Sequence, residues 1–219
     1  MPPNIIHSYF KLNYETKVKT VDNASSSMLL TDWLPQKIKQ QEDEIYSRHL
    51  QEHIKLSIIS TPMPDNKSEM NLLLLNDGQD VDQFRIKKIT DNLYKKKLIE
   101  PLLIVAIHAG NRTDNYGVSG FPDFQNRGSK ADKYDAFISD ELYDFAKKKA
   151  GVRKFNSIVM TGCSLGGLSA LDVAWNHTDK IDKVGVFSGS FWWRDKDITA
   201  ADYSEIGRAS CRERVCYPV

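Results

Sequence analysis

The pentapeptide Gly162-Cys163-Ser164-Leu165-Gly166 holds the residues of this sequence whose types and spacing best suit covalent chemistry. A Gly-x-Ser-x-Gly motif exposes a serine hydroxyl when it lies on a tight turn between a strand and a helix. Gly162 and Gly166 stand where only small residues avoid a clash between the two elements. The motif therefore predicts that Ser164 is a nucleophile; the alternative is a glycine-rich β–α turn without chemistry.

The stretches on both sides of this motif have the composition that such a turn requires. Residues 157–160 form a short apolar run that leads into the motif, and Leu168, Leu171 and Trp175 recur on one face of a helix expected from about residue 166. The turn would aim the backbone N–H of Leu165 at an oxyanion, close to the positive end of the helix dipole.

The elements that must position Ser164 alternate regularly along the chain. Strands separated by helices of this length indicate βαβ units, hence an α/β fold with a mostly parallel sheet and helices on both faces. Residues 1–50 are expected to hold an N-terminal extension and the first strands, with a polar, mostly exposed stretch at 36–52. Residues 51–204 are expected to form a partial core of this type. Strands are expected at 56–59, 72–75, 102–107, 157–160 and 184–187, and helices at 86–97, around 138–145 and from 166.

Composition excludes several classes of partner. The 219 residues suffice for one domain, and a net charge of +1 with mixed acids and bases argues against nucleic acid. Neither a signal peptide nor an apolar run of about 20 residues is found, which predicts a cytoplasmic protein without membrane contact. The histidines and acids lack metal-ligand spacing and cofactor motifs are absent, so neither a metal nor a cofactor is expected.

The tail from Glu205 to Val219 does not read like the rest of the chain. Its first residues match the translation of a string that resembles a common sequencing-library adaptor. We therefore expect that the gene was cut near Ser204 and that 205–219 is a non-native tail, the alternative being a natural Arg-rich end. Such a tail carries no information about the fold.

Two strings around the motif carry a family resemblance. Residues 159–168 and the string Phe187-Ser188-Gly189-Ser190-Phe191-Trp192-Trp193 are similar to the Putative esterase family of α/β-hydrolases, which includes enterochelin esterases and S-formylglutathione hydrolases. Residues 74–80 look like the strand and loop that precede this family's oxyanion hole. The likeness spans roughly 55–195 and implies a C-terminally truncated α/β-hydrolase.

The resemblance also implies a second oxyanion donor, and the residues themselves indicate further contacts. A second oxyanion donor would be the backbone of Gln79 or Gly78, unless that segment is only a β-turn. Arg112 would hold the charged end of a substrate or, more in keeping with its surroundings, pair with Asp140 or Glu141. His108 and Trp192 are possible substrate contacts, with structural roles as their alternatives.

The sequence lacks an obvious general base for Ser164. In α/β-hydrolases the triad runs in the order serine, acid, histidine. The one histidine after Ser164 is His177, on the helix that follows, and we expect it to point away from the hydroxyl. The acid and the histidine are thus expected beyond residue 204, and this fragment is expected to be nearly inactive.

The leading functional expectation is hydrolysis of a small-molecule carboxylic ester through an acyl-enzyme on Ser164. A thioester substrate, as in S-formylglutathione hydrolases, would use the same machinery. The alternative from another class is a non-catalytic binding protein of the same fold, which would keep the turn and lose the base.

Overall fold

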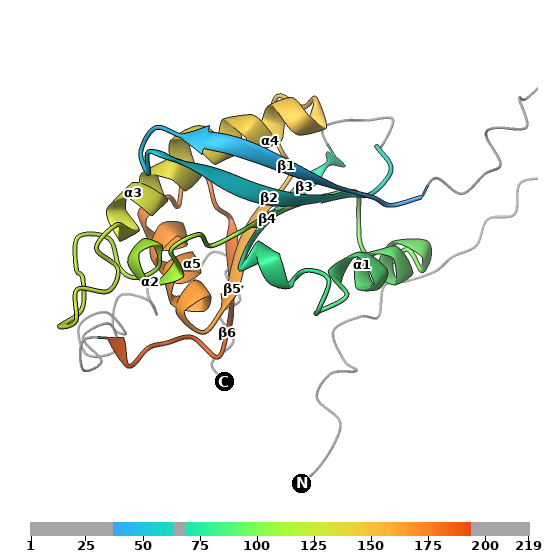
Figure 1. Cartoon of the computed structure of the whole chain (residues 1–219). Coiled ribbons are helices and arrows are strands. Elements are labelled where there is room, and N and C mark those ends of the chain that lie inside the picture. The colour runs from blue at the N-terminus through green and yellow to red at the C-terminus, as the bar shows by residue number, and fades with distance from the viewer. Residues whose placement is uncertain (1–36, 64–68, 194–219) are drawn as a thin grey trace, which may run out of the picture. The chain divides into compact units, whose positions relative to one another are not determined.

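The computed structural model describes residues 37–63 and 69–193, and within them the chain forms one six-stranded sheet (Figure 1). The strand order is β1-β2-β4-β3-β5-β6. The three pairs from β4 through β3 and β5 to β6 are parallel, whereas β1–β2 and β2–β4 are antiparallel. The strands are β1 (Lys39–Ser47), β2 (Glu52–Ser60), β3 (Asn71–Asn76), β4 (Leu102–Ile107), β5 (Ile158–Cys163) and β6 (Lys183–Phe187). The mostly parallel α/β sheet expected from the sequence is confirmed.

Helices cover both faces of this sheet, as predicted. Figure 1 shows α1 on one side and α3, α4 and α5 on the other. The helical elements are a 3₁₀ turn η3 (Gly78–Asp80), α1 (Ile86–Lys95), α2 (Arg112–Asn115), α3 (Ala131–Ala136), a π-helix η4 (Phe137–Leu142), α4 (Tyr143–Ala150) and α5 (Leu165–Asn176). None of the helices in the described ranges combines the length and apolar character needed to cross a bilayer.

Alternation along the central strands explains why both faces need a cover. In β4, Leu103, Val105 and Ile107 join the larger core cluster under α3, η4, α4 and α5, while Ile104 and Ala106 join the smaller one with α1 residues. Successive side chains of a strand point to opposite faces, so an unbroken apolar run buries both. The apolar run at 102–107 was therefore a reliable strand signal.

β1 is the strand that the sequence did not locate. It lies inside the polar stretch 36–52, and most of its residues are indeed exposed or half-buried. As an edge strand it is paired only with β2, through a turn that gives Gln51 a φ of 58°. Charged edge strands discourage pairing with other chains, and the same charges hide the strand from hydrophobic pattern analysis.

The helix predicted around 138–145 is longer than its apolar spacing indicated. α3, η4 and α4 follow one another without a break from Ala131 to Ala150, and Gly151 ends α4 with a φ of 63°. The predicted glycine cap at Gly151 is thus confirmed. The tail 205–219 and most of the extension that precedes β1 lie outside the described residues.

Leu56 tests the contribution of the larger core cluster to stability. Its side chain is 0% exposed, whereas Leu98, just after α1, is 57% exposed. We expect Leu56→Ala to lower the free energy of unfolding by about 2–5 kcal/mol because it removes buried methyl groups and leaves a cavity. The control Leu98→Ala should change it by only about 0.5 kcal/mol. Urea unfolding measures both, and equal effects would contradict the core described here.

Candidate active site

Ser164 lies on the turn between β5 and α5 in the conformation that the motif predicted. Its φ of 55° and ψ of −121° are strained for a residue with a side chain. The Ser164 backbone N–H donates to the Phe187 carbonyl at 2.9 Å, and the Ser164 carbonyl accepts from Gly167 N at 3.0 Å and from Leu168 N at 3.1 Å. These bonds hold the residue in place, and its side chain is exposed.

The two glycines of the motif permit close backbone contacts. A Cβ on Gly162 would lie 2.3 Å from the Gly166 carbonyl oxygen, and one on Gly166 would lie 2.6 Å from Asp77 Oδ2. Neither distance is compatible with a real side chain, because the first neighbour is backbone and the second is a buried carboxylate. The close neighbours of Gly162 and Gly166 therefore explain why only small residues fit at both positions, as predicted.

A pocket of about 490 Å³ opens beside Ser164. Its lining combines the motif with the loop that follows β3 and with Arg112, and Phe84 and Phe187 add exposed aromatic surface to its walls. Gln79 lines the pocket, so the structure brings this residue and Ser164 together although 85 positions separate them in the sequence. A site built from two loops at one sheet edge is typical of α/β folds.

The two candidates for a second oxyanion donor differ in their surroundings. Gly78 is buried, and a Cβ there would lie 2.5 Å from the Ala106 carbonyl, so this glycine is needed for packing on β4. Gln79 is exposed, and its side-chain Oε1 accepts from Ala109 N at 3.2 Å. Within the described residues no acceptor is found for the backbone N–H of Gln79 or of Leu165. The role of these two N–H groups as oxyanion donors stays a prediction.

Arg112 is held by Asp77 rather than by Asp140 or Glu141. Its Nε donates to Asp77 Oδ1 at 2.8 Å and its Nη2 donates to Asp77 Oδ2 at 3.2 Å, so the ion pair is bidentate. The hydrogen bond to Asp77 raises the pKa of the Arg112 guanidinium. The expected ion pair is thus present, but its predicted partners were wrong, because α2 turns Arg112 toward the end of β3.

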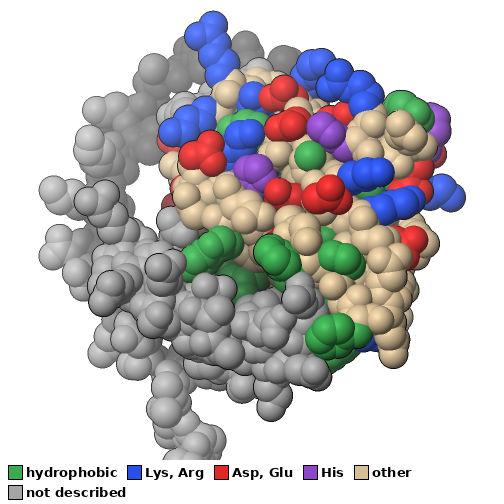
Figure 2. All heavy atoms as spheres, turned by 90° about the vertical axis from the view of Figure 1, so that its left-hand side faces the viewer, with side chains coloured by type: hydrophobic (Ala, Val, Ile, Leu, Met, Phe, Trp, Pro, Cys, Tyr) green, Lys and Arg blue, Asp and Glu red, His purple; other side chains and the backbone are tan. Residues whose placement is uncertain are grey.

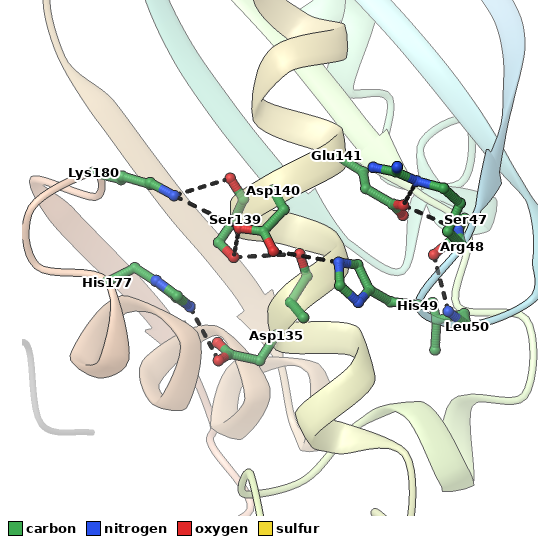
Figure 3. A network of polar contacts seen from close by, with 11 residues as sticks. Ser47, Arg48, His49, Leu50, Asp135, Ser139, Asp140, Glu141, His177 and Lys180 are labelled. Atoms are coloured by element: carbon green, nitrogen blue, oxygen red, sulfur yellow. Dashed lines mark hydrogen bonds and ion pairs between the residues drawn. The ribbon is translucent and has the colours of Figure 1, made fainter.

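The acids first considered for Arg112 have other partners. Asp140 lies 3.3 Å from His49 Nε2, and Glu141 accepts from the backbone and the Nε of Arg48 at 3.0 Å each. Figure 3 shows these side chains on the π-helix η4, facing the turn that follows β1. They tie the helix to the sheet and do not reach the pocket beside Ser164.

A buried polar network connects the end of β3 to the serine turn. Asn76 Nδ2 donates to the Gly166 carbonyl at 2.8 Å, and the Tyr134 hydroxyl donates to Asn76 Oδ1 at 2.6 Å. The backbone N–H of Asp77 donates to the Tyr116 hydroxyl at 3.0 Å. Burial raises the pKa of both tyrosines, so both hydroxyls stay protonated at neutral pH.

Sequence reasoning did not assign these network residues a role. Asn76 and Asp77 belong to the string 74–80, which the resemblance relates only to the strand and loop before the oxyanion hole. The position of two polar residues directly after a buried strand was the available signal, because strand ends in parallel sheets converge at one edge.

The histidines described by the structure do not contact Ser164. Its Oγ lies 3.1 Å from the Ser190 Oγ. As predicted, His177 is remote from the hydroxyl: it caps the end of α5 opposite Ser164. Its Nε2 lies 3.0 Å from Asp135 Oδ2 (Figure 3). The general base required by a serine nucleophile is therefore not found in the described part of the chain.

His108 resembles a triad member only at first sight. Its Nε2 lies 2.9 Å from the Ser57 Oγ and 3.7 Å from Glu42 Oε2, and Ser57 donates to the same carboxylate at 2.7 Å. In a catalytic triad the acid and the serine bind opposite nitrogens of the ring, whereas here both contacts fall on Nε2. His108 thus links β4 to β1 and β2, and it does not line the pocket beside Ser164.

The two tryptophans have different surroundings. Trp193 is 1% exposed and donates its indole N–H to the Phe121 carbonyl at 3.2 Å, so it closes the core. Trp192 is 52% exposed, with the Arg127 guanidinium 5.1 Å from its ring centre. Neither ring lines the pocket beside Ser164. The role of Trp192 as a substrate contact stays a prediction.

The surface of the described residues shows mixed charge. On the face drawn in Figure 2, acidic, basic and histidine side chains are interspersed, and hydrophobic side chains gather below them. Among the described residues, histidines, cysteines and acids do not form a group of three able to hold a metal ion.

Comparisons with known proteins add a family match and a set of structural likenesses. Residues 47–214 match the family model described as Putative esterase, a range that extends past residue 204. The uncharacterized protein YbbA of Bacillus subtilis is 24% identical over 155 residues, which cover 64% of this chain and 62% of YbbA.

Two solved structures illustrate the likeness in fold. The enterobactin esterase FES of Shigella flexneri, in the presence of enterobactin, superimposes with a TM-score of 0.61 at 23% identity, covering 78% of this chain and 42% of FES. The BES protein of Bacillus cereus gives 0.58 at 20% identity, covering 84% and 70%. The chain thus spans less than two thirds of YbbA and of FES.

The Arg112–Asp77 pair is expected to contribute more than a surface ion pair. The Asp77 side chain is only 9% exposed and that of Arg112 is 38% exposed. A double-mutant cycle of Arg112→Met and Asp77→Asn should give a coupling energy of about 1–2 kcal/mol, between the values for exposed and buried pairs.

The matched control is the exposed pair of Lys95 and Asp91 on α1, whose side chains are 62% and 34% exposed. Its cycle, with Lys95→Met and Asp91→Asn, should give about 0.5 kcal/mol or less. Urea unfolding of the four single and two double variants provides both values. Equal coupling in the two pairs would refute a special role for the pair at the pocket.

Proposed function

This chain belongs to the Putative esterase family of α/β-hydrolases, and on that premise we propose that the protein hydrolyses carboxylic esters of small molecules through an acyl-enzyme on Ser164. The observation that carries the proposal is the strained Ser164 at the β5–α5 turn, which faces one pocket together with Gln79 and Arg112. A nucleophile on such a turn has its hydroxyl exposed at the carboxyl edge of the sheet.

The proposed reaction has two steps. In the first, the Ser164 Oγ attacks the carbonyl carbon of the ester, its proton passes to a base, and the alcohol leaves with a proton. In the second, water attacks the acyl-enzyme, releases the acid and restores the hydroxyl of Ser164. Both steps pass through a tetrahedral oxyanion, for which the N–H groups of Leu165 and Gln79 are the proposed donors. One such donor typically contributes about 3 kcal/mol to transition-state stabilisation.

The proposal requires an acid and a base in addition to the described groups. His177 is bonded to Asp135 and His108 to Ser57, so neither is available to Ser164 in this arrangement. We propose that both triad partners come from native sequence that would follow Ser204, and that the chain of 219 residues alone is nearly inactive. We also propose that the protein is located in the cytoplasm.

The names of further structural neighbours mention an esterase and a hydrolase. Besides the enterobactin esterase, they include a ferulic acid esterase and the siderophore hydrolase EstA of Aspergillus nidulans. Their identities of 20% and 16% carry the fold only, so the substrate class rests on the family and on the pocket.

A non-catalytic binding protein of the same fold is the second candidate. It is favoured by the contact of the Ser164 Oγ with Ser190 instead of a histidine. The strained backbone at Ser164 argues against it, because a cost of about 1–3 kcal/mol at a functional turn is typically retained for a use.

A fluorophosphonate probe separates the two candidates. Applied to the gene product extended in its native frame beyond Ser204, it should label the protein stoichiometrically because an activated serine attacks phosphorus as it attacks an ester. Ser164→Ala should abolish labelling, and intact-protein mass spectrometry measures the added mass.

The control variant is Cys163→Ala, which removes the exposed thiol next to the serine and should leave labelling unchanged. The chain of 219 residues should label far more slowly than the extended protein. Labelling that persists in Ser164→Ala, or an extended protein that resists the probe, would contradict the proposal.

A further inference from the structure

A second hollow, distinct from the one beside Ser164, lies between the start of β1 and α1. Its volume is about 500 Å³. Ile38 and Val81 contribute buried apolar surface, with exposed fractions of 6% and 3%, and most of the remaining lining residues are charged. Hollows of roughly 300–1,000 Å³ that combine apolar surface with a few polar groups are typical of small-molecule sites.

The charge of this hollow is strongly unbalanced. Its lining includes two carboxylates and five cationic side chains, which are Lys37, Arg85, Lys87, Lys88 and Lys95. The excess of three positive charges exceeds the net charge of +1 of the entire chain. Positive charge is therefore concentrated here and is not a general property of the surface.

Both carboxylates of the hollow already have partners. Asp82 Oδ1 accepts a hydrogen bond from Gln40 Nε2 at 3.2 Å, and Asp91 Oδ2 lies 2.6 Å from Lys95 Nζ. Asp91 is thus paired with a cation, whereas Asp82 is bonded to a neutral amide and offsets one of the four remaining positive charges.

The remaining four cations have no acidic partner among the described residues. Two of them, Lys87 and Lys88, stand in the first turn of α1, which contains no acidic residue. The helix dipole disfavours cations at that end and favours anions. An anion in the hollow would relieve both the mutual repulsion of the cations and this unfavourable placement.

We infer that the hollow between β1 and α1 binds a small, multiply charged anion, with phosphate or pyrophosphate groups as its chemistry. The forked donors of Arg85 match the oxygens of a phosphate, and the lysine ammonium groups supply point charges around it. A trianion balances the excess of three charges, and a dianion offsets most of it. The inference goes beyond the proposed ester hydrolysis and does not depend on Ser164.

Inorganic pyrophosphate is the probe that tests this site. Titrated at low salt into the ¹⁵N-labelled chain of 219 residues, it should produce saturable shifts confined to the amides of residues 37–40 and 81–95. Because hydrogen bonds to charged groups are stronger than those between neutral groups, the triple variant Arg85→Gln, Lys87→Gln, Lys88→Gln should weaken binding at least about tenfold.

The matched control removes the same charges elsewhere. Lys133, Arg153 and Lys154 are exposed and do not line the hollow, so the triple glutamine variant at these positions should keep the affinity within about twofold. The ¹⁵N spectra also report whether each variant is folded. Equal weakening in both variants, shifts spread over the whole surface, or no saturable shift would overturn the inference.

Discussion

The close approach of the β5–α5 turn to the end of β3 is the constraint on which the candidate active site depends. Gly162 and Gly166 lie against backbone and carboxylate atoms at distances that no side chain tolerates, and the Asn76 amide holds the Gly166 carbonyl at 2.8 Å. This contact keeps the turn in its strained form, because an unfavourable conformation persists only where its surroundings over-determine it. It also brings Gln79 and Ser164 to one pocket.

The buried polar network extends this constraint to segments far apart in the sequence. Asn76 ends β3 and Asp77 follows it, while Arg112 lies on α2 and Tyr134 on α3. Hydrogen bonds nevertheless connect each of them to a neighbour in the network. In a low-dielectric interior an unpaired polar group is costly, so such a network specifies one arrangement of its elements. The network contributes to the site by fixing the positions of its side chains more than by stabilising the fold.

The sheet determines where these segments can meet. In its parallel part, from β4 to β6, the neighbouring strands β3 and β5 run in the same direction, so their carboxyl ends lie side by side. The antiparallel strands β1 and β2 extend the sheet beyond β4. Membership of the Putative esterase family agrees with this sheet arrangement. The likeness to solved esterases shows a similar fold. Within the described residues, histidines do not contact Ser164.

The sequence by itself determined the features that depend on neighbours along the chain. Continuous apolar runs such as 102–107 identified buried strands, the glycine at 151 identified a helix end, and the spacing around Ser164 identified its turn. Each of these is a local property, since side-chain period and backbone freedom act over a few residues. The sequence did not locate β1 because an exposed edge strand needs no apolar pattern.

Only the tertiary structure decided the partners of polar side chains. Arg112 pairs with Asp77, 35 positions earlier, and not with the acids of the next helix; His108 is bonded to Ser57, 51 positions earlier. Trp193 enters the core, whereas Trp192, its immediate neighbour, stays largely exposed. A long side chain can reach many partners, and the choice depends on distances between segments that no local spacing encodes. The sequence thus determined Ser164 as the candidate nucleophile, and the fold decided which residues surround it.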